Sequence, residues 1–263
     1  MKLITLMENT ASREDLTAEH GLSLYIEACG KKILFDAGQT AAFADNAEKL
    51  GVDLTRVDLA ILSHGHYDHS GGLMRFLQIN KTAKVYVHKD AFAPHFNSTG
   101  SYIGPNPALL ETGRIVFNPG TFALCQGLTL TDFAGAPSEY PIDSAGLLME
   151  ENGEKVPENF CHEQYLMIRE EEQVTCISGC SHKGILNITK WANPDILVGG
   201  FHFMNIDPET PEKARLDHAA EKLLESKAVF YTGHCTGAAP YEYLKARMGD
   251  RLNYISTGTK IVV

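Results

Sequence analysis

The sequence has few of the features that mark membrane, secreted or nucleic-acid-binding proteins. No stretch approaches the roughly 20 consecutive apolar residues of a membrane span, and the first residues lack the apolar core and small-residue cleavage site of a signal peptide. The 6 cysteines form no CxxC pair, which argues against a disulfide scaffold. Lys and Arg number 23 against 33 Asp and Glu, and the resulting net charge of -10 repels nucleic acid and anionic lipid. We expect a cytoplasmic protein with neither a nucleic-acid nor a membrane partner.

Apolar runs of strand length alternate with helix-like segments along the whole chain, which predicts a layered α/β fold. The pattern indicates a hairpin over 22–38, a helix over 70–79 capped by Ser70, and an amphipathic helix over 210–227 with Pro211 in its first turn. It also predicts one closing strand over 252–263. The turn-rich segment at about 89–158 is expected to leave the core and cover a functional face. No linker or repeat interrupts the chain, so we predict a single domain over 1–263.

The segment ILSHGHYDHSGGL at 61–73 places three histidines and an aspartate in six positions directly after a buried strand. Residues two apart in an extended segment point the same way, so His64 and His66 can approach one ion together. Asp68 and His69, beyond Tyr67, can turn toward a second ion. Imidazole and carboxylate ligands at this density suit a borderline divalent metal. The cluster therefore predicts two adjacent metal sites.

The motif SHGHYDHSGG resembles the HxHxDH signature of the metallo-β-lactamase superfamily, and the resemblance extends along nearly the whole chain. It implies a four-layer αβ/βα sandwich with two central mixed β-sheets. ILFDAG resembles an early strand of that fold and would place Asp36 beneath a ligand histidine, while VFYTGHCTG would bring His234 to the second metal. HEQYLMI, ISGCSHKGILNI, GGFHF and STGTKI resemble a narrower branch named after a dihydropterin ribofuranosyl-aminobenzene phosphate synthase.

The third ligand of the first metal is less clearly marked. Cys180 stands where the superfamily pattern has a metal-bridging aspartate, with His182 two residues later. His182 is the preferred ligand, His162 is its competitor, and Cys180 remains a further candidate. His202 is expected to face the site, either as a ligand or as a catalytic, substrate-binding group. The remaining histidines are left out of the ligand set: His20, His88, His95 and His218.

The resemblance thus implies a first metal on His64, His66 and His182 and a second on Asp68, His69 and His234. Zinc is the preferred metal, with iron or manganese as alternatives. Such metals lower the pKa of bound water toward about 7 and supply hydroxide at neutral pH. We predict a binuclear hydrolase in which metal-bound hydroxide attacks a small, anionic substrate, an ester, phosphodiester or lactone, with Asp68 and His202 as catalytic groups. The sequence does not indicate the oligomeric state.

Two other functions remain open. One is the transferase chemistry of the branch name, acting on a ribosyl pyrophosphate and a pterin or aminobenzoate acceptor, for which Lys183, Lys260 and Arg114 are candidate pyrophosphate ligands. The other is an oxygen-reducing di-iron protein of the same fold. That second alternative is disfavoured, because such proteins carry a glutamate at the position of His66 and usually an attached flavin domain.

Overall fold

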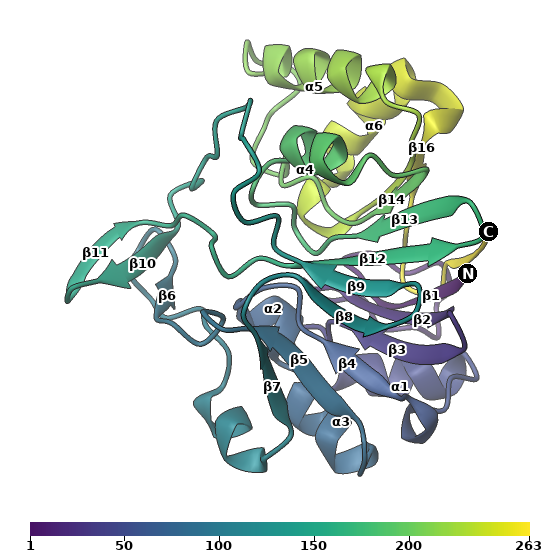
Figure 1. Ribbon diagram of the computed structural model, residues 1–263. Helices are drawn as coiled ribbons and strands as arrows, with labels where there is room; N and C mark the ends of the chain where they lie inside the picture. The colour runs from purple at the N-terminus through teal and green to yellow at the C-terminus, as the bar shows by residue number, and fades with distance from the viewer.

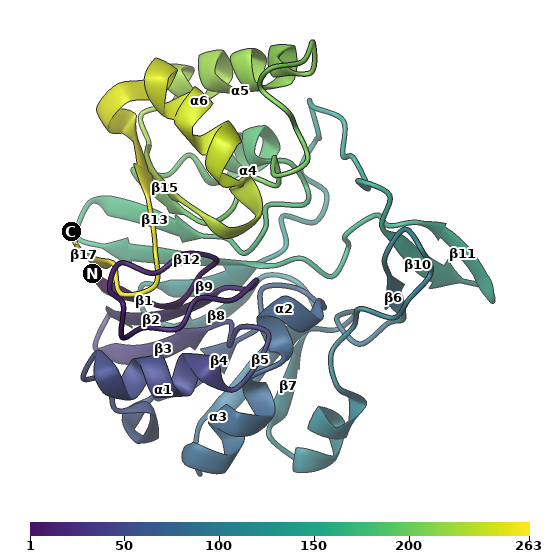
Figure 2. The ribbon, with the colours of Figure 1, turned by 180° about the vertical axis from the view of Figure 1, so that it is seen from behind.

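The computed structural model describes residues 1–263 and has four layers, with two mixed β-sheets packed face to face and helices outside each sheet (Figures 1 and 2). The first sheet has the order β17-β1-β2-β3-β4-β5-β7. Its strands are β1 (Lys2–Met7), β2 (Ser23–Ala28), β3 (Lys31–Phe35), β4 (Leu59–Ile61), β5 (Lys84–His88), β7 (Ile115–Asn118) and β17 (Lys260–Val262). On its outer face lie α1 (Ala42–Lys49) and α3 (Leu73–Ile79), and the short α2 (Tyr67–Ser70) precedes α3.

The second sheet has the order β16-β15-β14-β13-β12-β9-β8. Its strands are β8 (Phe122–Cys125), β9 (Leu128–Thr131), β12 (Tyr165–Glu170), β13 (Gln173–Ile177), β14 (Ile196–Val198), β15 (Val229–Thr232) and β16 (Leu252–Tyr254). Its outer face is covered by α4 (Ile185–Ala192), α5 (Lys213–Glu225) and α6 (Ala238–Met248). The predicted αβ/βα sandwich is confirmed. None of the helices is long and apolar enough to span a bilayer.

Alternating apolar side chains build the core between the two sheets. Ile26 and Phe35 of the first sheet and Leu166 of the second are fully buried in one apolar cluster. Further clusters fill the spaces between each sheet and its own helices. This packing holds the loops at one edge of the two sheets in a fixed relation.

The segment at about 89–158 divides into two parts. Strands β7, β8 and β9 extend the two main sheets, whereas β6 (His95–Phe96), β10 (Leu148–Glu151) and β11 (Glu154–Pro157) form a small third sheet that projects from the body (Figure 1). The segment thus contributes to both the core and a projecting flap.

Three local predictions were wrong. Ser70 ends α2 and does not cap α3: the N-cap of α3 is Gly72, and Ser70 Oγ has no hydrogen-bond partner. Gly71 and Gly72 separate the two helices, because their backbone passes too close to that of Gln39 and Ala37 for a side chain. Pro211 precedes α5, whose first residue is Lys213. The single closing strand is in fact two, since the chain leaves the second sheet after β16 and joins the first as β17.

Candidate metal centre

The predicted site residues come from loops at one edge of both sheets. His64 follows β4 in the first sheet, while His182, His202 and His234 follow β13, β14 and β15 in the second. Strands β13 to β15 are parallel, so their carboxyl ends lie side by side. Ligand sites in α/β folds form at such edges, because the loops there converge.

One group of donors gathers His64, His66 and His182. All three are buried, and one donor atom from each lies within 4.8 Å of the others. The Nε2 atoms of His64 and His182 are 3.3 Å apart. His66 Nε2 is buried without any hydrogen-bond partner, a position that is costly for a polar atom unless something binds it.

The second group gathers Asp68, His69 and His234. The Nε2 atoms of the two histidines are 3.2 Å apart, and Asp68 Oδ2 lies 3.5 Å from His69 Nε2 and 3.2 Å from His234 Nε2. Two nitrogen ligands about 2.0–2.1 Å from a tetrahedral metal would be about 3.3 Å apart. Both donor groups therefore have the spacing and the chemistry that a divalent metal requires.

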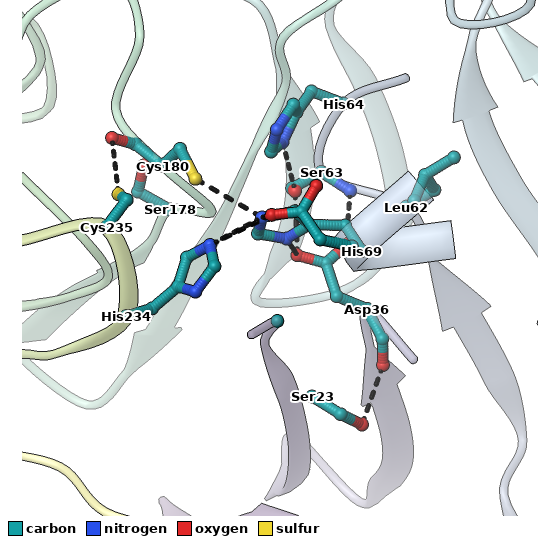
Figure 3. Close-up of polar contacts among 12 residues, drawn as sticks. Ser23, Asp36, Leu62, Ser63, His64, His69, Ser178, Cys180, His234 and Cys235 are labelled. Carbon is teal, nitrogen blue, oxygen red and sulfur yellow. Dashed lines mark hydrogen bonds and ion pairs between the residues drawn. The ribbon is translucent and has the colours of Figure 1, made fainter. Parts of the chain in front are cut away.

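Asp36 fixes the tautomers of two of these histidines (Figure 3). Its carboxylate accepts hydrogen bonds from Ser63 N, Ser63 Oγ and His69 Nδ1, each at 2.7 Å. Because Ser63 Oγ donates to Asp36, it accepts from His64 Nδ1 at 2.8 Å. Both imidazoles thus carry their proton on Nδ1 and leave the Nε2 lone pair free for a metal. The position expected for Asp36, beneath a ligand histidine, matches this contact.

His234 is positioned by residues that the sequence did not single out. Its Nδ1 donates to Asn9 Oδ1 at 2.9 Å, and its backbone N–H donates to Glu8 Oε1 at 2.5 Å. His20, which was left out of the ligand set, lies with Nε2 3.3 Å from Asp68 Oδ2 and lines the cavity. Its short distance to Asp68 depends on the fold of the N-terminal loop and has no local sequence signal.

The position of the ring proton decides whether His162 can bind metal through Nε2. Gly65 N–H donates to His162 Nδ1 at 2.8 Å, so the neutral ring carries its proton on Nε2. His162 Nε2 lies 3.7 Å from Glu158 Oε1, beyond hydrogen-bond distance, whereas the Nδ1 of His95 donates to Glu158 Oε2 at 2.7 Å. A protonated Nε2 cannot bind metal, and this tautomer favours His182 as the third ligand.

His202 lies beside the ligand groups and outside them. Its ring centroid is 4.4 Å from that of His182, and it lines the same cavity. Its φ of 57° lies in the left-handed region, as do the φ values of Asp36, Ser181 and His234. Non-glycine residues held there cost about 1–3 kcal/mol each and tend to concentrate at functional sites.

Burial controls the protonation of the imidazoles in the metal-free protein. It lowers the pKa of His66 to about 3 and that of His234 to about 4, and it holds the pKa values of His64 and His182 well below the usual range. His69 is the exception: burial again opposes its charge, but Asp68 and Asp36 outweigh burial and raise its pKa. Most of these rings are thus neutral at pH 7, the form that binds metals.

Two hollows meet at His182 and His202. One, of about 310 Å³, is lined by both donor groups and by residues of the projecting segment, including Asn97 and Leu147, but by no lysine or arginine. The other, of about 250 Å³, runs between α4 and α5 and is mainly apolar, with Arg215 on its wall.

The lysine and arginine candidates for binding pyrophosphate lie elsewhere. Lys183 is buried and donates to the carbonyls of Asp132 and Glu163, and Arg114 donates to the carbonyl of Ala83. Lys260 is exposed on β17, a strand at the edge of the first sheet.

Comparison with known proteins agrees with this geometry. The family described as the metallo-beta-lactamase superfamily matches residues 16–149. The 7,8-dihydropterin-6-methyl-4-(beta-D-ribofuranosyl)-aminobenzene-5'-phosphate synthase of Methanocaldococcus jannaschii is 32% identical in an alignment of 271 positions, gaps included, that covers 90% of this chain and 88% of that protein. The chain belongs to the metallo-β-lactamase superfamily. The predicted resemblance, to the superfamily and to the synthase branch, is confirmed.

Solved structures of the superfamily give the same picture. Tm1679, described as a metal-dependent hydrolase of the β-lactamase superfamily, superposes with a TM-score of 0.83 at 25% identity over 100% of this chain and 99% of the other. Zn(2+)-bound PqqB from Methylobacterium extorquens superposes with a TM-score of 0.59 at 13% identity over 100% of both chains. The second similarity shows that the two chains share a fold.

Proposed function

We propose that this protein is a binuclear metal-dependent hydrolase that cleaves a small anionic ester, phosphodiester or lactone. The observation that carries the proposal is the pair of donor groups, one of three imidazoles and one of two imidazoles and a carboxylate, at the spacing of metal ligands beside an open cavity. His64, His66 and His182 would hold the first metal. Asp68, His69 and His234 would hold the second.

Zinc is the preferred metal, since neutral imidazole and carboxylate suit it, with iron or manganese as alternatives. A pair of such ions lowers the pKa of a water toward about 7 and stabilises charge on both the attacking and leaving oxygens. The protein supplies the rest. Asp36 and Asn9 accept hydrogen bonds from the Nδ1 atoms of His69 and His234 and so leave the Nε2 atoms of these rings free to bind metal.

Asp68 and His202 are the catalytic groups of the proposal. The Asp68 side chain is 10% exposed and lines the cavity, where it would hold the second metal and orient a water. Burial lowers the pKa of His202, so its ring is neutral at pH 7 and donates an N–H hydrogen bond to the leaving group. His20, across from Asp68, is 41% exposed and is placed to bind substrate at the rim.

The cavity points to a small anionic substrate with an apolar part. Since no lysine or arginine lines the hollow at the donor groups, the metals themselves would balance the substrate's negative charge. The apolar hollow that shares His182 and His202 is placed to take the rest of the molecule, within the size range of small-molecule sites. The net charge of -10 argues against nucleic acid as the substrate.

A transferase acting on a ribosyl pyrophosphate is the second candidate, because the curated relative from M. jannaschii is named a synthase. The positions of Lys183, Lys260 and Arg114 do not favour it, since none lines the cavity.

The test is metal analysis of the purified protein together with a panel of chromogenic phosphodiester, ester and lactone substrates. We expect two metals per chain and turnover that is lost in His66→Ala. Two metals without hydrolysis, but with pyrophosphate release from a ribosyl pyrophosphate and an aminobenzoate, would establish the transferase instead. A protein that binds no metal after reconstitution would refute both.

A further inference from the structure

We propose that Cys180 is a thiolate ligand of the metal centre, lying between the two histidine groups, so that the site selects zinc, iron(II) or cobalt(II) over manganese. This inference rests on the metal centre of the proposed function. It adds a sulfur donor to a set made otherwise of nitrogen and oxygen.

The position of the sulfur carries the inference. Cys180 Sγ lies 3.2 Å from His69 Nε2, and Figure 3 shows the side chain turned toward that ring. Cys180 groups with His64 and His69 on one side and with His234 and Cys235 on the other, each time with the donor atoms within 4.8 Å. A sulfur about 2.3 Å and a nitrogen about 2.0–2.1 Å from one tetrahedral metal would be about 3.5 Å apart. The distance from Cys180 Sγ to His69 Nε2 therefore fits two ligands of one metal, and the sulfur also lies within 4.8 Å of donor atoms of His64 and His234.

The chain is built to bring Cys180 there. A side chain at Gly179 would collide with Ser63 Oγ and lie 3.0 Å from His64 Nδ1, so only glycine lets this loop approach the histidine loop of the other sheet. Ser181, the next residue after Cys180, has a φ of 57°, which turns the chain toward His182. The glycine at 179 and the left-handed backbone at Ser181 together place Cys180 at the metal centre, and both are conformationally unfavourable.

The other buried cysteines show that burial alone does not produce this contact. Cys176 packs in the apolar cluster between the second sheet and its helices. Cys235 donates from Sγ to the carbonyl of Cys180 at 3.5 Å. By contrast, Cys180 Sγ lies within hydrogen-bond distance of His69 Nε2, the ring atom that faces the metal centre. Metal binding then replaces the S–H proton of Cys180 by a metal–sulfur bond and releases the proton to solvent.

The proposal predicts metal preference. Thiolate is a soft ligand that favours zinc, iron(II) and cobalt(II), whereas manganese prefers carboxylate, carbonyl and water oxygens. A site with five imidazoles, one carboxylate and one thiolate should therefore retain zinc in the presence of excess manganese.

The test is reconstitution of the metal-free full-length protein with cobalt(II). We expect a thiolate-to-cobalt charge-transfer band in the near ultraviolet, its loss in Cys180→Ser, and its retention in the matched controls Cys235→Ser and Cys176→Ser. Wild type should also release one more proton per chain than Cys180→Ser when zinc is added in weak buffer at pH 7. Serine keeps the shape of the side chain, and near-ultraviolet circular dichroism checks that the variant is folded.

Cobalt bound with ligand-field bands but no charge-transfer band in the wild type would overturn the Cys180 assignment and leave the binuclear centre standing. A band that is lost in Cys235→Ser and kept in Cys180→Ser would overturn it in favour of the neighbouring cysteine. Failure to bind cobalt and zinc at all would refute the metal centre itself.

Discussion

Asp36→Asn should weaken metal binding although Asp36 would touch no metal. The carboxylate accepts three hydrogen bonds at 2.7 Å and sets the tautomer of His69 directly and of His64 through Ser63. An asparagine amide offers one acceptor oxygen, and Ser63 N–H, which can only donate, claims it. The NH₂ group then takes the place of Oδ2, where it donates to His69 Nδ1 or Ser63 Oγ and moves the ring proton onto Nε2. Partners of this kind change metal affinity by about 10–100-fold, or about 1.4–2.7 kcal/mol. Because two ligands depend on Asp36, we expect the upper end of that range.

The assay is competition for zinc with a chromophoric chelator, together with thermal unfolding in the presence and absence of EDTA. Asparagine tolerates the left-handed φ of 58° at this position, so backbone strain would not explain a loss. Asp195→Asn is the matched control, since its carboxylate accepts a backbone N–H from Val174 at 2.8 Å at the opposite end of β14 from His202. Unchanged zinc affinity in a folded Asp36→Asn variant would refute the tautomer argument.

Three further predictions follow from the same geometry. His182→Ala should lower the metal content from two ions per chain to one, whereas His162→Ala should keep both; elemental analysis of the two variants distinguishes them. His202→Asn, which can adopt the same φ, should keep both metals and lower kcat by about 10²–10⁴-fold; an unchanged kcat would remove His202 from catalysis. In the EDTA-treated protein the pKa values of His66 and His234, about 3 and about 4, lie below the value of about 6.5 in the unfolded chain. The unfolded state then binds more protons, so the free energy of unfolding in urea should fall as the pH falls from 6.5 to 4, and a rise would contradict it.

The histidine cluster was visible in the sequence because its members are neighbours in the chain. His64, His66, Asp68 and His69 directly follow an apolar run that predicts a strand. Residues two apart in an extended segment point the same way, so the spacing alone predicts that these side chains gather at one place. The alternation of apolar runs likewise predicted the layers. Both inferences rest on patterns between neighbouring residues, and the fold keeps these patterns because the strands are buried.

What the sequence could not indicate depends on contacts between distant segments. Asn9 and His20 reach the site only because β1 pairs with β2 and β17 and brings the N-terminal loop against the loop after β15. The choice between His162 and His182 depends on one hydrogen bond from Gly65 N–H, which no spacing reveals. Tautomers are a property of the folded environment, and ligand assignments in this chain depend on them.

The donors come from both halves of the sandwich, and this has a consequence for stability. His64 and His69 belong to the first half, His182 and His234 to the second, and their rings are packed with centroids 4.2 to 4.9 Å apart. In the metal-free protein these rings expose lone pairs to one another in a buried space, an arrangement that costs free energy because the atoms lose their hydrogen bonds to water. A metal bound to donors of both halves removes that cost and joins the two sheets at their shared edge. Metal binding to the folded state alone then adds to stability in proportion to the logarithm of the metal concentration over its dissociation constant, so the centre would serve the fold as well as the chemistry.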